Sequence, residues 1–153
     1  RAVHINIVKM TIHLVKIAVG IESIDHLRDL QLERICRAKE QGVHDKLIHL
    51  TRNTPRRRNE VLQNGSIYWI IKGYIRVRQH IIGMEKVVGR NGQQLCALVL
   101  DPLLKKTILL PHKPIQGWRY MEEEAVPNDL NEDEIKSSLP SSMAEELRSL
   151  GLL

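Results

Sequence analysis

The stretch of the chain from residue 66 to residue 100 constrains the fold most, because it alternates like a series of strands. Over residues 66–88 β-branched apolar side chains alternate with polar or aromatic ones, which is the period of a strand with two different faces. Gly73 breaks or bends this run. Residues 89–92 form a typical hairpin turn, and residues 94–100 predict the next strand. A short helix stays an alternative inside the first run, because four residues also follow a helical period: Ile70, Ile71, Tyr74 and Ile75.

Shorter elements surround this region. Ser23 is a suitable N-cap for an amphipathic helix that stops near Gly42. Thr54 and Pro55 are a typical cap and first helical residue for a second helix. The other expected elements are strands at 11–19, 47–52 and 105–110 and the end of the second helix near Gln63. Together they predict an α+β fold: a small, mostly antiparallel, barrel-like sheet with two helices packed against it and a C-terminal acidic arm.

The length of 153 residues fits one compact domain. We expect a single globular α+β domain over residues 10–121. Residues 1–9 are interpreted as an upstream extension, because Met10 opens a cleaner strand pattern. Residues 122–153 are acidic, and we expect a linker that ends in a short helix with Ser142 and Glu145 as its capping box.

Charge divides the chain in the same place. Residues 1–121 carry a net charge of +12 and residues 122–153 a net charge of −7. A basic body favours a polyanionic partner, and an acidic tail can cover the basic surface or simply aid solubility. No apolar run has the length of a membrane span. Cys36 and Cys96 lie in apolar surroundings, which indicates two buried reduced thiols and a cytoplasmic protein.

All aromatic side chains lie in two short basic segments. The chain has two Trp, three Tyr and no Phe, and they fall within residues 66–78 and 116–120. If the first segment is one continuous strand, Trp69 faces the core, and Tyr68 and Tyr74 share the other face with cations. Trp118 either stacks on a ligand or plugs the end of the barrel. Rings interleaved with cations are what a surface needs to stack bases and hold phosphates.

A triplet of arginines at 56–58 sits in the expected first turn of the second helix, where cations oppose the helix dipole. This position suits a group that meets an anion, although the side chains can also simply extend into water. We therefore predict an RNA or nucleotide site formed by ten residues: Arg56, Arg57, Arg58, Tyr68, Lys72, Tyr74, Arg76, Arg78, Trp118 and Arg119.

Two other functions stay open. An enzyme acting on a nucleotide or another phosphorylated small molecule would use Asp101, His49 or His112 for acid–base chemistry. However, the sequence has no recognisable catalytic motif, Asp101 also suits the cap of a turn, and no cofactor or metal site is expected. A protein-interaction module would use the acidic arm to occupy its own basic face until a partner displaces it.

Five segments in order resemble a known group of bacterial proteins. They are Thr11-Ile-His-Leu-Val-Lys-Ile-Ala-Val-Gly, His49-Leu-Thr-Arg, Gly65-Ser-Ile-Tyr-Trp-Ile-Ile-Lys-Gly, Cys96-Ala-Leu-Val-Leu-Asp-Pro and Gln116-Gly-Trp-Arg-Tyr. This group is the domain of unknown function 1489 family, and the resemblance runs from about Met10 to Leu130 with a similar ending. It implies no activity, cofactor or catalytic residue. A shorter likeness, Lys72-Gly73 followed by Arg76 and Arg78 after a helix, is similar to the RNA-associated PUA and ASCH barrels and concerns the fold alone.

Overall fold

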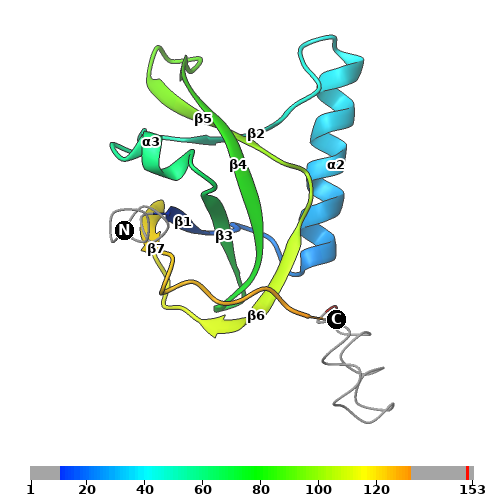
Figure 1. Cartoon of the computed structure of the whole chain (residues 1–153). Helices are drawn as coiled ribbons and strands as arrows, with labels where there is room; N and C mark the ends of the chain where they lie inside the picture. The colour runs from blue at the N-terminus through cyan, green and yellow to red at the C-terminus, as the bar shows by residue number, and fades with distance from the viewer. Residues whose placement is uncertain (1–10, 132–150, 152–153) are drawn as a thin grey trace.

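A computed structural model of the chain describes residues 11–131 and residue 151. Its strands and helices confirm the α+β class (Figure 1). In chain order they are β1 (Ile12–Ile17), α2 (Ile24–Glu40), β2 (Leu47–Thr51), α3 (Arg58–Val61), β3 (Ser66–Ile71), β4 (Tyr74–Val88), β5 (Gln94–Leu100), β6 (Lys105–Pro111) and β7 (Trp118–Glu122).

The seven strands form one sheet that curls without closing (Figure 1). Its order is β2-β5-β4-β3-β1-β7, with β6 beside β4, and only the β1–β3 pair is parallel among the described strands. β6 pairs with residues 74–78 of β4 and β5 with residues 81–88, and the β4–β5 pairing has a register shift between Ile81 and Gly83. The predicted barrel-like sheet is therefore an open one, with β2 and β7 as its ends.

Strands β3 and β4 are joined by a tight turn. Lys72 and Gly73 both have positive φ, 51° and 83°, and Ile71 pairs with Tyr74 across the turn. Two left-handed residues give the twist that a two-residue hairpin needs. The alternative of a short helix here is therefore wrong, and the first aromatic segment is two strands rather than one continuous run.

The long helix forms as predicted, and the short one begins later than predicted. In α2 the Ser23 hydroxyl accepts a hydrogen bond from the His26 N–H at 3.0 Å. In α3 the N-cap residue is Arg57, without a side-chain cap, so Thr54 does not start the helix. The reason is a long-range contact, because the Arg57 N–H donates to the Tyr120 hydroxyl at 3.0 Å and not to a local cap.

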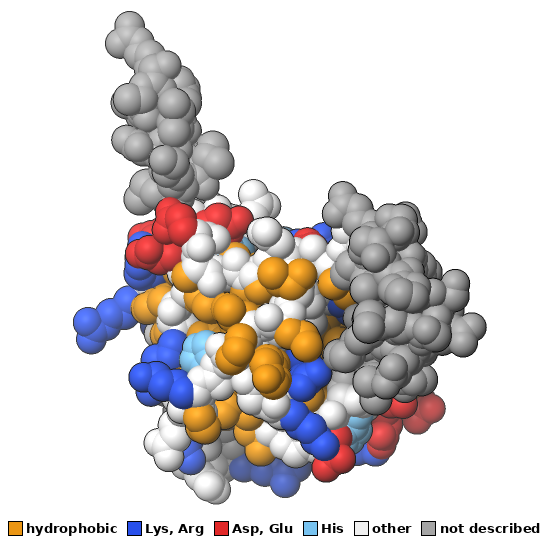
Figure 2. Space-filling view, turned by 90° about the horizontal axis from the view of Figure 1, so that it is seen from below, with side chains coloured by type: hydrophobic (Ala, Val, Ile, Leu, Met, Phe, Trp, Pro, Cys, Tyr) orange, Lys and Arg blue, Asp and Glu red, His pale blue; other side chains and the backbone are white. Residues whose placement is uncertain are grey.

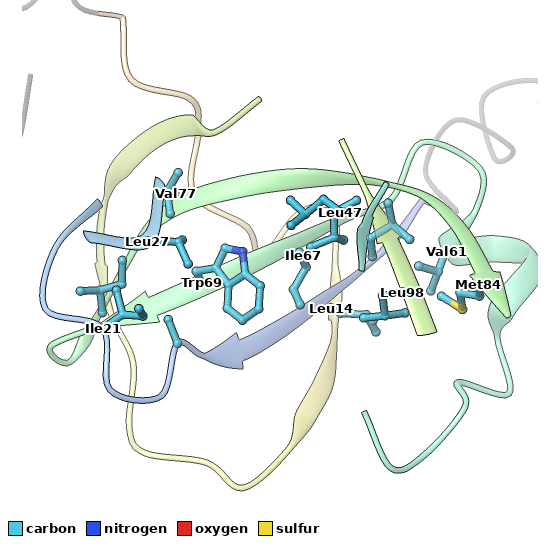
Figure 3. Packing of buried hydrophobic residues seen from close by; sticks show 14 of the residues in the cluster. Leu14, Ile21, Leu27, Leu47, Val61, Ile67, Trp69, Val77, Met84 and Leu98 are labelled. Atoms are coloured by element: carbon cyan, nitrogen blue, oxygen red, sulfur yellow. The ribbon is translucent and has the colours of Figure 1, made fainter. Parts of the chain in front are cut away.

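The main core lies between the concave face of the sheet and the helices, with Trp69 inside it (Figure 3). Trp69 is 3% exposed, which confirms its predicted core position. Its indole N–H donates to the Gln79 side-chain oxygen at 2.8 Å, and the amides of Gln79 and Gln31 exchange two hydrogen bonds of 2.8 Å. Cys96 is buried here, whereas Cys36 lies exposed on α2, so only one thiol is buried as expected.

A second apolar cluster covers the other face of β3. Tyr68 is 3% exposed and packs there with Val15, Ile70 and Ile75. Met121 of β7 and Val126 of the segment that follows this strand pack against the cluster. The prediction that Tyr68 lies on an exposed face is therefore wrong for this structure, because β3 is buried on both faces.

The described part of the acidic arm, residues 122–131, lies against the sheet. The Ile108 N–H donates to the Asn128 carbonyl at 2.9 Å, and the Leu130 N–H donates to the Lys106 carbonyl at 2.8 Å. The predicted extension at 1–9 and the C-terminal helix lie outside the described residues. None of the helices among the described residues is long and apolar enough to cross a bilayer.

The face seen from below carries apolar side chains in its middle, with Lys and Arg around them (Figure 2). Strand β6 lies at the bottom of Figure 1, and its Ile108 and Leu109 are exposed.

Candidate functional site

The two ends of the open sheet approach each other through side chains of β7. The Trp118 indole N–H donates to the Asn53 carbonyl just after β2, at 3.1 Å. Two residues later, the Tyr120 hydroxyl accepts from the Arg57 N–H. The rings of Trp118 and Tyr120 pack edge to face, with centroids 4.9 Å apart. These contacts tie β7 to the segment after β2 and leave a seam between the two ends of the sheet.

An open groove of about 740 Å³ lies along this seam. Lys16 of β1 pairs in register with Trp118, so its side chain starts beside the ring. The residues that line the groove are Lys16, Leu50, Thr51, Arg52, Asn53, Gln116, Gly117, Trp118 and Arg119.

The groove is basic, and none of its lining residues is acidic. Arg119 donates to the carbonyls of Gln116 and Trp118 at 2.6 and 2.9 Å, which fixes its guanidinium without neutralising it. Burial lowers the pKa of Lys16, because desolvation disfavours its charged form. An anion in the groove would compensate for that cost.

The arginine triplet divides among three roles. Arg57 pairs with Glu60, and its guanidinium carbon is 5.7 Å from the centroid of the Tyr120 ring. Arg58 donates to the Met84 carbonyl at 2.8 Å and so ties α3 to β4. Arg56 is exposed. Only Arg57 therefore contacts the aromatic pair of β7.

Tyr68 and Arg78 lie together under the arm. Arg78 donates two hydrogen bonds to the Asp129 carboxylate, at 2.7 and 2.8 Å, and a third to the Ser66 hydroxyl at 2.9 Å. Burial raises the pKa of Tyr68 to about 12, although the Arg78 charge works in the opposite direction. The His13 ring packs edge-on against Tyr68 and pairs with Glu123 of the arm. We call the surface formed by His13, Tyr68 and Arg78 the covered face.

The remaining three predicted residues lie at the β3–β4 turn. The Arg76 guanidinium carbon is 5.3 Å from the centroid of the exposed Tyr74 ring, and its Nε donates to the Ile71 carbonyl at 2.6 Å. The Lys72 ammonium is 3.8 Å from the Glu22 carboxylate. Strands β3 and β1 lie between this turn and β7, and neighbouring strands are about 4.8 Å apart. The two aromatic segments are therefore separated across the sheet. The ten predicted residues thus occupy four places, namely the start of α3, the covered face, the β3–β4 turn and the groove, and the groove brings together only Trp118 and Arg119.

Sequence reasoning did not include Lys16 among the site residues. The available signal was a single lysine inside an otherwise apolar strand. Of the three acid–base candidates, the Asp101 carboxylate accepts from the Leu103 N–H at 3.0 Å as a turn cap, and His112 contacts the neighbouring Lys113 carbonyl at 2.8 Å. His49 alone lines a cavity next to the groove. In the part of the chain that the structure describes, His, Cys, Asp and Glu side chains form no group of three or more suited to a metal ion.

Comparison with known proteins identifies the family. The family model described as Protein of unknown function (DUF1489) matches residues 14–153, so the chain belongs to this family. No curated protein and no solved structure matches the chain. The likeness to PUA and ASCH barrels therefore finds no support.

Proposed function

We propose that this member of the DUF1489 family binds a nucleotide or single-stranded RNA in the seam groove. One observation carries this proposal: the groove combines the Trp118 ring with cations of Lys16, Arg52 and Arg119, and no lining carboxylate neutralises them. The predicted site at Arg56–Arg58, Tyr68 and residues 72–78 is thereby narrowed to the β7 end of the sheet.

The physical basis is the combination of stacking and charge. Base–aromatic stacking contributes about 1–3 kcal/mol per base and tolerates any sequence, because every base has a π-face. Lys16, Arg52 and Arg119 approach the groove from β1, from the end of β2 and from β7, so a phosphate between them is met from three directions.

The test is a titration of the full chain with a short, fluorescently labelled single-stranded RNA at several salt concentrations, read by the fluorescence anisotropy of the label. This readout does not depend on Trp118, so it also measures the affinity of variants at that position. Trp118→Leu is expected to weaken binding about tenfold or more, the loss of one stacked base.

Arg90→Ala is the matched control, since Arg90 is exposed in the β4–β5 turn, away from the groove residues. Unchanged affinity in Trp118→Leu, or equal affinity for RNA and for heparin, would remove the stacking site and leave only generic charge.

A second candidate is the interaction module whose acidic arm competes with a polyanion. It has a specific observation behind it, because Asp129 holds Arg78 in a two-bond contact and Glu123 pairs with His13. The double variant Glu123→Gln with Asp129→Asn replaces both carboxylates by neutral amides. It is expected to bind RNA several-fold more tightly at low salt, because the arm then no longer competes for the cations. An unchanged affinity in the double variant would remove this role for the arm.

A further inference from the structure

A second, smaller space lies beside the seam groove and shares Lys16 with it. This inner cavity has a volume of about 160 Å³ and lies between the end of β1, the start of β2 and α2. Lys16 lines both spaces, so they meet at its side chain. Apolar side chains make up most of the inner wall, including Ile21, Leu27 and Trp69. The seam thus has an open basic half and an inner apolar half.

His49 lines the inner cavity with a ring nitrogen that lacks a partner. His49 lies on the same face of β2 as Leu47 and Thr51, because side chains two residues apart in a strand point the same way. Leu47 and Thr51 are both buried, so the His49 ring lies on the core side of the strand. The ring packs edge-on against Trp69, with centroids 5.0 Å apart and planes at 86°. Over residues 11–131, His49 Nε2 is the one buried side-chain nitrogen or oxygen without a hydrogen bond.

His49 Nε2 lacks a hydrogen bond, whereas the other buried polar side chains around it all have one. The Trp69 indole N–H and the amides of Gln31 and Gln79 are all paired with each other in the same layer of the core. Buried polar atoms in proteins are nearly always paired, and exceptions require an explanation. A ligand that brings a donor or acceptor to His49 Nε2 would supply the missing hydrogen bond.

The charge around His49 favours a neutral ring. Burial, then the charges of Lys16 on β1 and Arg34 on α2, lower the pKa of His49 to about 4. The partner ring from β3, Trp69, is uncharged. A neutral imidazole offers one N–H and one lone pair, which suits the edge of an uncharged heteroaromatic ring.

We propose that the inner cavity holds the base of a nucleoside monophosphate against His49 Nε2, while Lys16, Arg52 and Arg119 hold its phosphate in the open half. This inference rests on the proposed function and narrows its ligand from a polymer to a mononucleotide or the terminal nucleotide of a strand. A cavity of about 160 Å³ has room for a single base, so we expect it to take a free nucleotide or the nucleotide at the end of a strand.

The experiment is calorimetric titration of the full chain with the four nucleoside monophosphates and with ribose 5-phosphate, which carries the phosphate without the base. At least one nucleotide is expected to bind about tenfold or more tightly than ribose 5-phosphate, the effect of one buried hydrogen bond with ring burial. In His49→Leu this preference is expected to fall several-fold while the affinity for ribose 5-phosphate stays, because the hydrogen bond is lost and only ring burial remains. His49→Gln keeps a hydrogen-bonding group and is expected to retain part of the preference.

The outcomes separate the two proposals. Equal binding of nucleotides and ribose 5-phosphate overturns the inner site and leaves the groove as an anion site. A nucleotide preference that is undiminished in His49→Leu overturns the role of His49. If neither a nucleotide nor ribose 5-phosphate binds, the inner site is overturned, and the RNA titration with Trp118→Leu decides the proposed function separately. Since leucine suits an apolar cavity, the thermal midpoint of His49→Leu is expected to be no lower than that of the natural chain, and His49→Gln serves if it is lower.

Discussion

The seam groove and the covered face start from the same ingredients, cations beside aromatic rings, and end in opposite states. In the groove, Arg119 contacts only backbone carbonyls among the described residues, and Trp118 borders open space. On the covered face, Arg78 holds Asp129 and Tyr68 is buried beneath the arm. The two surfaces differ in their carboxylates, because the arm supplies Glu123 and Asp129 to the covered face and no carboxylate lines the groove.

This contrast shows that a ring next to a cation in the sequence does not define a binding surface. A cation that has a carboxylate within hydrogen-bond distance is already neutralised, and a ligand must displace that partner first. A cation that bonds only to carbonyls keeps its charge for a ligand. We therefore expect the groove to accept an anion directly and the covered face to accept one only after the arm leaves.

The largest expected difference between the two regions concerns stability. Tyr68→Ala removes a buried ring and is expected to cost about 3–5 kcal/mol of unfolding free energy, as for other large core aromatics. Trp118→Leu keeps apolar bulk in a half-buried position and loses one hydrogen bond, so about 1 kcal/mol is expected. Urea denaturation of the full chain measures both. A Tyr68→Ala loss as small as that of Trp118→Leu would mean that the arm does not bury Tyr68.

The next difference is in pH dependence and concerns His49 beside the groove. Its folded pKa of about 4 lies below the ordinary value of 6.5, so the unfolded chain binds the proton more readily. Stability is therefore expected to fall as the pH drops from about 6.5 to about 4, by about 3 kcal/mol at most. Lys16 and Arg34 are the charged groups that face His49 and lower its pKa together with burial.

In His49→Leu this part of the pH profile is expected to flatten, and His112→Gln is the control because His112 contacts its neighbouring carbonyl. Urea midpoints at pH 4.5 and 7 suffice. A profile of His49→Leu that overlays that of the natural chain would place the His49 ring in water.

Local chemistry explains which parts of the fold were predictable. The strand at 94–100 and the turn at 89–92 were predicted with their boundaries, because glycine-rich turn residues and a short apolar run bounded by them are signals that act over a few neighbours. Ser23 likewise caps α2 through a contact three residues away. The late start of α3 was not predictable, because it depends on Tyr120, which is 63 residues further along the chain.

The site depends even more on distant contacts. The groove exists because Trp118 reaches Asn53 across the open seam, and no pattern within either segment encodes that meeting. Tyr68 was misplaced for a related reason. Alternation predicts one buried face and one exposed face, but Val126 of the arm folds back and buries the second face of β3. Trp118 and Arg119 were predicted as site residues because their residue types suit a ligand wherever they lie, and both line the groove.

A smaller expected difference between the groove and the covered face concerns how RNA binding depends on salt. Each phosphate contact on a single strand contributes about 0.7 to the slope of log affinity against log salt. Arg52→Ala is expected to reduce the slope by about that amount, since Arg52 lines the groove. Arg78→Ala is expected to leave the slope unchanged, because Asp129 already occupies Arg78.

The decisive comparison repeats Arg78→Ala in an Asp129→Asn background. Freed from Asp129, Arg78 becomes able to meet a phosphate, so its removal is now expected to lower the slope. A slope that depends on Arg78 with the arm intact would show that the covered face takes part in binding directly.

The smallest expected effect is the acid release of the arm. The hydrogen bonds from Arg78 hold the pKa of Asp129 below its ordinary value of 3.8. A depressed carboxyl pKa contributes stability above 3.8, and this contribution is lost as the pH falls through the lower folded value. Because the Asp129 side chain is 48% exposed, solvent screening keeps the contribution below about 1 kcal/mol.

An NMR titration that follows the Arg78 Nε–H resonance tests this contact without relying on so small a free energy. The resonance is expected to keep its hydrogen-bonded position down to pH values below 3.8 and to move only as Asp129 takes up its proton. In Asp129→Asn it is expected to lie at its shifted position throughout. If the resonance of the natural chain instead moves with an ordinary aspartate titration, Arg78 does not hold Asp129 in solution. The covered face would then be as open to an anion as the groove, and the distinction between a ready site and an occupied one would rest on the burial of Tyr68 alone.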